Sequence, residues 1–288
     1  MRYPARYVPR RLVVPPGLPP GRIRLLPERG EAFYRHHEGG RPGAPTLLLL
    51  HGWTASADLQ WFTAYEALGE RYPFVAIDHR GHGRGLRSDE AFTLEDAADD
   101  AAALVRELGI GPIALLLAHR HPDLVRGLVL EATALEWKAT LRDRFSWRGL
   151  VLMEAFLRSR MSRWFGRRAV RVLANRNPEL EPYLGWVLAE SRRGDAADIA
   201  DAGRALSRYD ARPFAASLDR PAAVVLTTQD HLVKAPKQRA LADALDARIF
   251  GLDGDHFAFW GTAKQFADTT RQAVDDVVSR LAVGATRR

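Results

Sequence analysis

The sequence predicts an α/β protein in which a mostly parallel central sheet is flanked by helices. Strands and helices alternate along most of the chain, which is the order that builds such sheets. Several expected strands are continuously apolar, as is typical of strands covered by helices on both faces. The length of 288 residues is sufficient for one large core with a smaller lid.

The first half of the chain supplies the expected elements in a regular order. A proline- and arginine-rich arm over residues 1–21 is followed by two short strands that meet at Gly30. Residues 46–50 form an apolar strand that ends in a His-Gly turn. The next segments are a helical stretch, WFTAYEALGERY, and a second buried strand, PFVAI, which ends in a glycine-rich loop. A helix then begins at the cap Thr93, with Asp96 in the position of a capping-box acid.

The second half continues the alternation around a helical insertion. Strands are expected in VRGLVLEATA, PAAVVLTTQDHLV and ARIFGLDGDHF, with a helix in KQRALADALDA and a closing helix over residues 262–282. The chain is therefore expected to comprise an extension over residues 1–21, a first core part over 22–135, a helical lid over 136–212 and a second core part over 213–283.

The composition excludes several classes of protein and site. The chain has no cysteine, which excludes disulfides and cysteine-based metal sites. The apolar run after the basic N-terminus is interrupted by Pro15 and Pro16 and is too short for a secretory signal. No stretch approaches the roughly 18 apolar residues of a membrane-spanning helix. We therefore expect a cytoplasmic protein.

The excess positive charge is concentrated in the expected lid. The chain has a formal net charge of +7, and residues 138–171 contain ten basic side chains against two acidic ones. A solvated basic face is the simplest interpretation, and weak contact with an anionic membrane or an acidic substrate is the alternative. No nucleic-acid partner is expected, because no nucleic-acid-binding motif accompanies the charge. Apolar residues at spacings of three and four predict one amphipathic helix in this segment, with the arginines on its other side. These apolar residues are Leu150, Met153, Leu157, Met161 and Trp164.

Two polar residues in the second half form a candidate acid–base pair. Asp230 lies just beyond the apolar strand AVVLTT, where a carboxylate at the carboxyl end of a strand can face a shared crevice. His256 follows the last expected strand, 26 residues later. A carboxylate that orients a histidine is the arrangement found in serine-hydrolase triads. Asp255 and Asp253 are rival acids, and a surface acid with a satisfied core histidine is the non-catalytic alternative.

Five segments resemble the α/β-hydrolase superfamily, in the order that the family shows. They are LLLLHGWTASADLQWF, VAIDHRGHGRG, HPDLVRGLVLEATA, LTTQDHLV and GDHFAFW. The resemblance covers roughly residues 22–281 and is to single-domain, esterase- and lipase-like members with a helical lid. It implies a carboxylic-ester hydrolase in which Asp230 is the acid and His256 the base. It also implies a small apolar or ester-type substrate and neither a metal nor another cofactor.

The resemblance also gives a role to the turn after the first apolar strand. It implies that the backbone N–H of Trp53, in the His51-Gly52-Trp53 turn, stabilises the oxyanion of an attacked ester. A buried histidine and glycine that shape a tight turn are the structural alternative. The loop DHRGHG resembles a structural loop of the family, so we assign no role to His79 or His82. Two histidines three residues apart are weak evidence for a metal site.

The family's nucleophile is missing from this sequence. It normally lies on a strand, sharp turn and helix with the pattern G-x-S-x-G, yet no Ser or Cys occurs between Asp89 and Phe145. In one alignment IALLLAHRHPD is the helix after the elbow, Gly111 is the last elbow glycine and the nucleophile strand is lost. In the other alignment residues 113–117 are themselves the strand. The serines elsewhere are predicted to be caps or surface residues: Ser56, Ser88, Ser146, Ser159 and Ser162.

The loss of a central strand has consequences for both fold and function. We expect the strands on either side of the lost strand to have unpaired edges, or IALLL to change from helix to strand. We also expect the segment over residues 109–121 to be strained, rebuilt or poorly ordered. We expect an impaired or inactive ester hydrolase. The alternatives are a non-catalytic protein that binds a small ligand in the old cleft and a membrane-surface module that acts through the basic lid. The missing elbow has two explanations that fit the sequence equally, a deletion in the gene sequence and genuine divergence of the protein.

Overall fold

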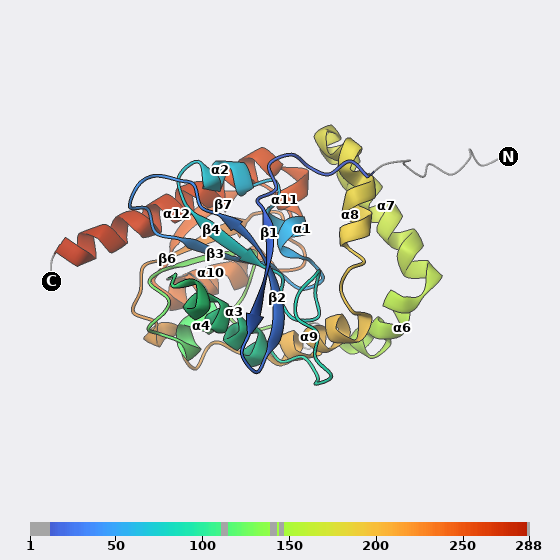
Figure 1. The fold of residues 1–288 in the computed structure, drawn as a ribbon, viewed down its shortest axis with the longest axis horizontal. Coiled ribbons are helices and arrows are strands. Elements are labelled where there is room, and N and C mark those ends of the chain that lie inside the picture. Colours follow the sequence, from blue (N-terminus) through green and yellow to red (C-terminus); the bar gives the residue numbers. More distant parts are fainter. Residues whose placement is uncertain (1–11, 111–114, 139–142, 144–146, 287–288) are drawn as a thin grey trace.

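The computed structural model describes residues 12–110, 115–138, 143 and 147–286 (Figure 1). The strands of this part of the chain are β1 (Gly21–Leu26), β2 (Gly30–His37), β3 (Leu47–Leu50), β4 (Phe74–Ile77), β5 (Leu128–Glu131), β6 (Ala222–Thr227) and β7 (Arg248–Leu252). The helices outside the insertion are α1 (Ala57–Trp61), α2 (Tyr65–Gly69), α3 (Leu94–Leu108), α4 (Leu115–Arg120), the short 3-10 helix η3 (Ala215–Ser217), α10 (Ala235–Ala244), α11 (Ala258–Gly261) and α12 (Ala263–Thr286).

The sheet topology confirms the predicted α/β class. The strand orders are β1-β2-β4-β3 in one sheet and β5-β6-β7 in the other. Three of the five strand pairings are parallel, and the two antiparallel ones involve β2. In Figure 1, α3, α4 and α10 lie below the strands, while α2 and α12 lie above them. The apolar cluster on each face contains strand residues of both sheets, so the two sheets belong to one core layer.

The described strands leave two edges open, one on β3 and one on β5. β3 pairs with β4 and β5 pairs with β6, but no described residue pairs with the other edge of either strand. This confirms the prediction of unpaired edges. Residues from Leu115 to Arg120 are helical, as the alignment without a nucleophile strand predicts. Residues 111–114, within the segment expected to be strained or rebuilt, lie outside the described residues.

The N-terminal cap predicted for α3 is present, and a glycine ends the helix. Thr93 Oγ1 accepts a hydrogen bond from the backbone N–H of Asp96 at 2.9 Å, which satisfies one of the free donors at the helix start. Gly109 ends the helix with φ of 65°, a left-handed conformation that suits glycine. The apolar side of the helix, which includes Leu104 and Val105, is buried in the core.

The insertion between β5 and β6 is helical, but the prediction of one long amphipathic helix is wrong. It contains η1 (Trp147–Leu152), α6 (Met153–Arg158), α7 (Arg160–Arg176), η2 (Pro178–Tyr183), α8 (Leu184–Glu190) and α9 (Ala196–Arg208). Ser159 is extended, and its hydroxyl accepts a hydrogen bond from the N–H of Ser162, so it ends α6 and caps α7. Met161 and Trp164 are consequently on a separate helix and remain 57% and 52% exposed. No helix among the described residues has the length and apolar character required to cross a bilayer.

Candidate active site

Asp230 and His256 are brought together at the carboxyl ends of β6 and β7. Asp230 Oδ2 lies 2.9 Å from His256 Nδ1 and accepts a hydrogen bond from Thr227 Oγ1 at 3.1 Å. Its other oxygen accepts hydrogen bonds from the backbone N–H groups of Leu232 and Val233, both at 2.8 Å. The carboxylate is therefore fixed by four contacts before any substrate binds.

In the pair of Asp230 and His256, the carboxylate accepts the hydrogen bond and the imidazole donates it. Burial alone raises the pKa of Asp230, but hydrogen bonds from His256 and from two backbone N–H groups outweigh it and hold the pKa below its ordinary value. Because an ionised carboxylate only accepts, His256 Nδ1 carries the proton and donates it. His256 Nε2 is then the ring nitrogen that can transfer a proton, and because the side chain is 32% exposed, a substrate can reach it.

The two rival carboxylates are engaged elsewhere. Asp255 forms an ion pair with Arg176 and accepts the backbone N–H of Phe257 at 2.9 Å. Asp253 accepts hydrogen bonds from Thr228 Oγ1 at 3.1 Å and Gln229 Nε2 at 2.7 Å. Of the three candidate acids, Asp230 is the one hydrogen-bonded to His256.

The His51-Gly52-Trp53 turn follows β3 and is held by its own hydrogen bonds. His51 Nδ1 donates to the Gly52 carbonyl and His51 Nε2 accepts from the backbone N–H of His79, both at 2.9 Å. The N–H of Gly52 donates to Gln60 Oε1 at 3.0 Å. No acceptor for the backbone N–H of Trp53 is present in the described part of the chain.

A cavity of about 230 Å³ adjoins this turn. Its walls are the carboxyl ends of β3 and β4, the first turns of α3, Leu117 of α4 and one side of α9. Leu50 at the open edge of β3 contributes to the lining, as does Trp53. Neither Asp230 nor His256 lines the cavity, which is therefore separate from the acid–base pair.

Three imidazole rings form the polar part of the cavity wall. The centroid of the His51 ring lies 4.5 Å from that of His79 and 5.4 Å from that of His82. His82 Nδ1 donates to the carbonyl of Arg80 at 3.0 Å, so its Nε2 is an acceptor. That Nε2 and His79 Nδ1 are buried without a hydrogen-bond partner among the described residues.

The three rings are neutral at physiological pH. Burial lowers the pKa of His79 to about 3, with His82 contributing, and burial also lowers the pKa of His82. Burial and the two neighbouring rings lower the pKa of His51 well below its ordinary value. No role was expected for His79 or His82 from the sequence. Their position directly after β4, the strand paired with β3, is the signal that places them beside His51. No cluster of His, Asp or Glu among the described residues has the arrangement of a metal site.

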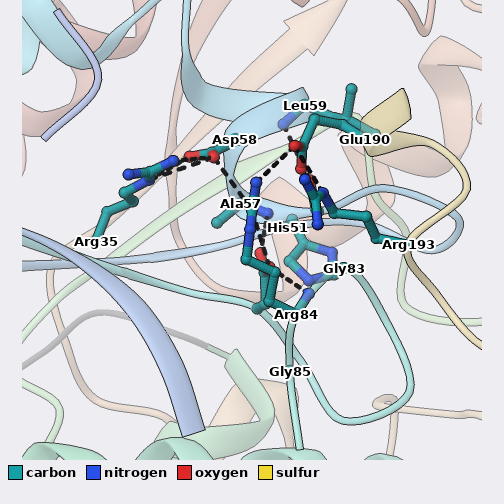
Figure 2. Close-up of polar contacts among 12 residues, drawn as sticks. Arg35, His51, Ala57, Asp58, Leu59, Gly83, Arg84, Gly85, Glu190 and Arg193 are labelled. Atoms are coloured by element: carbon teal, nitrogen blue, oxygen red, sulfur yellow. Dashed lines mark hydrogen bonds and ion pairs between the residues drawn. The ribbon is translucent and has the colours of Figure 1, made fainter. Parts of the chain in front are cut away.

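A buried ionic network connects the inserted helices to the core (Figure 2). Arg84, from the glycine-rich loop, lies between Asp58 of α1 and Glu190 of α8, at 3.3 Å and 2.5 Å. Arg35 of β2 contacts Asp58 at 2.6 Å, and Arg193 contacts Glu190 at 2.8 Å. The network therefore joins β2, α1 and α8 beside the turn that contains His51.

The described serines have structural roles, as predicted. Ser56 caps α1 by accepting the N–H of Leu59 at 3.2 Å, and Ser88 accepts the N–H of Glu90 at 3.1 Å in a turn. Ser159 caps α7, and Ser162 Oγ donates to two carbonyl groups of the preceding turn. Ser146 lies outside the described residues.

Comparisons with known proteins agree with the fold. Residues 45–262 match the family model described as alpha/beta hydrolase fold. The chain is 27% identical over 244 residues to the pimeloyl-[acyl-carrier protein] methyl ester esterase of Neisseria meningitidis, covering 80% of this chain and 94% of that protein. The crystal structure of the enol-lactonase from Burkholderia xenovorans LB400 gives a TM-score of 0.72 at 21% identity, over 88% of this chain and 100% of the other. A thermophilic esterase from Thermogutta terrifontis gives 0.71 at 20% identity, over 90% of this chain and 99% of the other. The last two likenesses concern the fold alone, and together with the family match they lead to one conclusion: the chain belongs to the alpha/beta hydrolase fold family.

Proposed function

We propose that this chain is a carboxylic-ester hydrolase by ancestry that retains the acid and base of its triad but lacks the nucleophile. The observation that carries the proposal is the hydrogen bond of 2.9 Å between Asp230 and His256. The buried, ionised carboxylate holds the imidazole in the tautomer that a general base requires. The N–H of Trp53 is a suitable oxyanion donor, and the relative from Neisseria meningitidis is an ester esterase.

The missing nucleophile implies impaired or absent turnover. No Ser or Cys occurs between Asp89 and Phe145, where the elbow of the family lies. Loss of a triad serine costs on the order of 10⁶ in kcat, and oxyanion stabilisation and binding leave on the order of 10³–10⁴ over water. The second oxyanion N–H comes from the elbow and is lost with it, so the remaining rate enhancement is expected to be smaller still.

Hydrolysis of p-nitrophenyl acetate tests this proposal. The chain and its His256→Ala variant are expected to give the same background rate, because His256 has no nucleophile to activate. A serine-reactive fluorophosphonate is expected to label neither protein. Turnover and labelling that disappear in His256→Ala would show that another serine serves as the nucleophile, and would refute the proposal.

The cavity beside His51 supports a second candidate function, the binding of a small ligand without catalysis. Its lining is mostly apolar, but His82 Nε2 and His79 Nδ1 are buried there without partners among the described residues. An unpaired buried acceptor costs about 1–3 kcal/mol, which a ligand donor would recover. The suitable ligand is a small apolar molecule with one O–H or N–H donor.

Phenol and toluene form the matched pair of probes for this second candidate. Phenol is expected to bind about fivefold more tightly than toluene, which corresponds to one net hydrogen bond. Replacement of the acceptor in His82→Phe should abolish that preference. The control is His36→Phe, because His36 Nδ1 is also buried without a hydrogen-bond partner among the described residues, with Glu38 3.6 Å away, but lies outside the cavity. Calorimetric titration measures both affinities, and equal affinities in the unmodified protein would exclude a hydrogen-bonding role for His82.

A further inference from the structure

The inserted helix α7 exposes a row of apolar side chains. Met161, Trp164, Phe165 and Val172 are 57%, 52%, 48% and 48% exposed. At 3.6 residues per turn these four positions fall on one side of the helix, and the buried Val170 falls on the opposite side. The apolar row therefore points away from the core, and Figure 1 shows α7 at the outer edge of the molecule.

Arginines occupy much of the rest of this helix, and Arg168 and Arg171 lie within and beside the apolar row. The helix contains no acidic residue, and its basic residues are Arg160, Arg163, Arg167, Arg168, Arg171 and Arg176, all of them exposed. The guanidinium of Arg168 lies 5.9 Å from the centre of the Trp164 ring, so cationic and aromatic groups share one surface. We call this surface, formed by the apolar row with Arg168 and Arg171, the α7 face.

The chemistry of the α7 face identifies its partner. A helix with an exposed apolar row and basic flanks is suited to lie in the plane of an anionic bilayer surface, with the apolar side chains among the acyl chains and the arginines at the phosphates. Each basic residue near such a surface contributes about 1 kcal/mol. Pairing with a second copy would bring two sets of arginines together, and that repulsion disfavours self-association.

We propose that the α7 face docks this protein on anionic lipid membranes. The inference goes beyond the proposed hydrolase function and does not depend on it, since α7 carries neither Asp230 nor His256. It also explains why two residues on the predicted apolar side of the inserted helix, Met161 and Trp164, are half exposed: the membrane, and not the protein core, covers them.

Co-sedimentation with sucrose-loaded vesicles tests this proposal. The full chain is expected to bind vesicles of phosphatidylcholine mixed with phosphatidylglycerol at least about tenfold more tightly than vesicles of phosphatidylcholine alone. Binding to the anionic vesicles should weaken steeply as NaCl is raised from about 0.05 to about 0.5 M, because salt screens the arginines. Equal binding to both vesicle types would overturn the proposal.

Two sets of variants separate apolar insertion from charge. Met161→Ser, Trp164→Ser and Phe165→Ser combined should weaken binding at least about tenfold, because they remove the side chains that enter the bilayer. The matched control combines Ile23→Ser and Leu25→Ser, which are 65% and 68% exposed on β1 and should leave binding unchanged. Arg168→Glu with Arg171→Glu should abolish the preference for anionic lipid, because these two exposed arginines lie within and beside the apolar row.

Two outcomes would contradict membrane docking even where α7 proves to be a binding surface. Undiminished vesicle binding by the triple serine variant would mean that the apolar row does not enter the bilayer. Binding of soluble poly-glutamate without binding of anionic vesicles would assign the α7 face to an acidic polypeptide. Circular dichroism of each variant checks that the substitutions, all at exposed positions, leave the fold intact.

Discussion

Replacing Asp58 with asparagine is expected to lower the free energy of unfolding by about 3–5 kcal/mol. The side chain is fully buried and accepts hydrogen bonds from Arg35 at 2.6 Å and 2.9 Å. Arg84 approaches the same carboxylate at 3.3 Å. An amide retains the shape but not the charge, so the variant leaves two largely buried guanidinium groups without their shared counter-ion. Urea unfolding followed by circular dichroism measures the loss.

A surface ion pair provides the matched control. Arg22 and Glu38 are 2.7 Å apart, yet their side chains are 43% and 65% exposed, so Glu38→Gln is expected to cost only about 0–1 kcal/mol. Adding Arg35→Met to the Asp58→Asn variant should recover part of the loss, because it removes one of the uncompensated charges. Equal losses for Asp58→Asn and Glu38→Gln would show that the network around Asp58 is solvated.

The same network explains how the inserted helices are held against the core. Glu190 of α8 is almost completely buried, and two arginines, Arg84 and Arg193, neutralise it. Arg84 is also bound to Asp58, so a change at Asp58 is transmitted to α8 through a single side chain. We therefore expect Asp58→Asn to loosen the position of the insertion as well as to destabilise the core.

The pairing of Asp230 with His256 could be predicted from sequence because its signals are local. Asp230 and His256 each follow a strand with a clear apolar pattern, and parallel strands bring their carboxyl ends to one edge of a sheet. The choice among Asp230, Asp253 and Asp255 could not be made from spacing alone. It depends on side-chain partners such as Arg176, which comes from the insertion.

Other features depend on contacts between distant segments and left little trace in the sequence. Arg84 and Glu190 are 106 residues apart, and neither position is marked by a motif. The cavity beside His82 is closed by α9, whose position no local pattern specifies. The helix break at Ser159 was not predicted because the apolar spacing continues across it. The hydroxyl of Ser159 caps α7 by accepting the N–H of Ser162, and this local hydrogen bond ends one helix and begins the next.

If the proposed function is right, inserting the family's nucleophile elbow is expected to produce the largest gain in activity. A strand of about five residues followed by a G-x-S-x-G turn, inserted between Ile110 and Leu115, would supply both the nucleophile and the second oxyanion N–H. The ester-hydrolysis rate is expected to rise by at least about 10³-fold, since a positioned triad serine accounts for on the order of 10⁶ in kcat. The inserted strand has two open edges to pair with, on β3 and β5, so the free energy of unfolding should rise as well.

Two controls determine what a gain or its absence means. The same insertion with alanine in place of the serine should raise stability without raising activity, and His256→Ala in the serine-containing insertion should return the rate to background. A stable insertion variant without a gain in hydrolysis would mean that Asp230 and His256 are not arranged for catalysis. An insertion that lowers stability would mean instead that the open edges of β3 and β5 cannot accept a strand. A hydrolase fold without its nucleophile should therefore respond to the insertion in two independent ways: the sheet gains stability, and the pair of Asp230 and His256 gains activity.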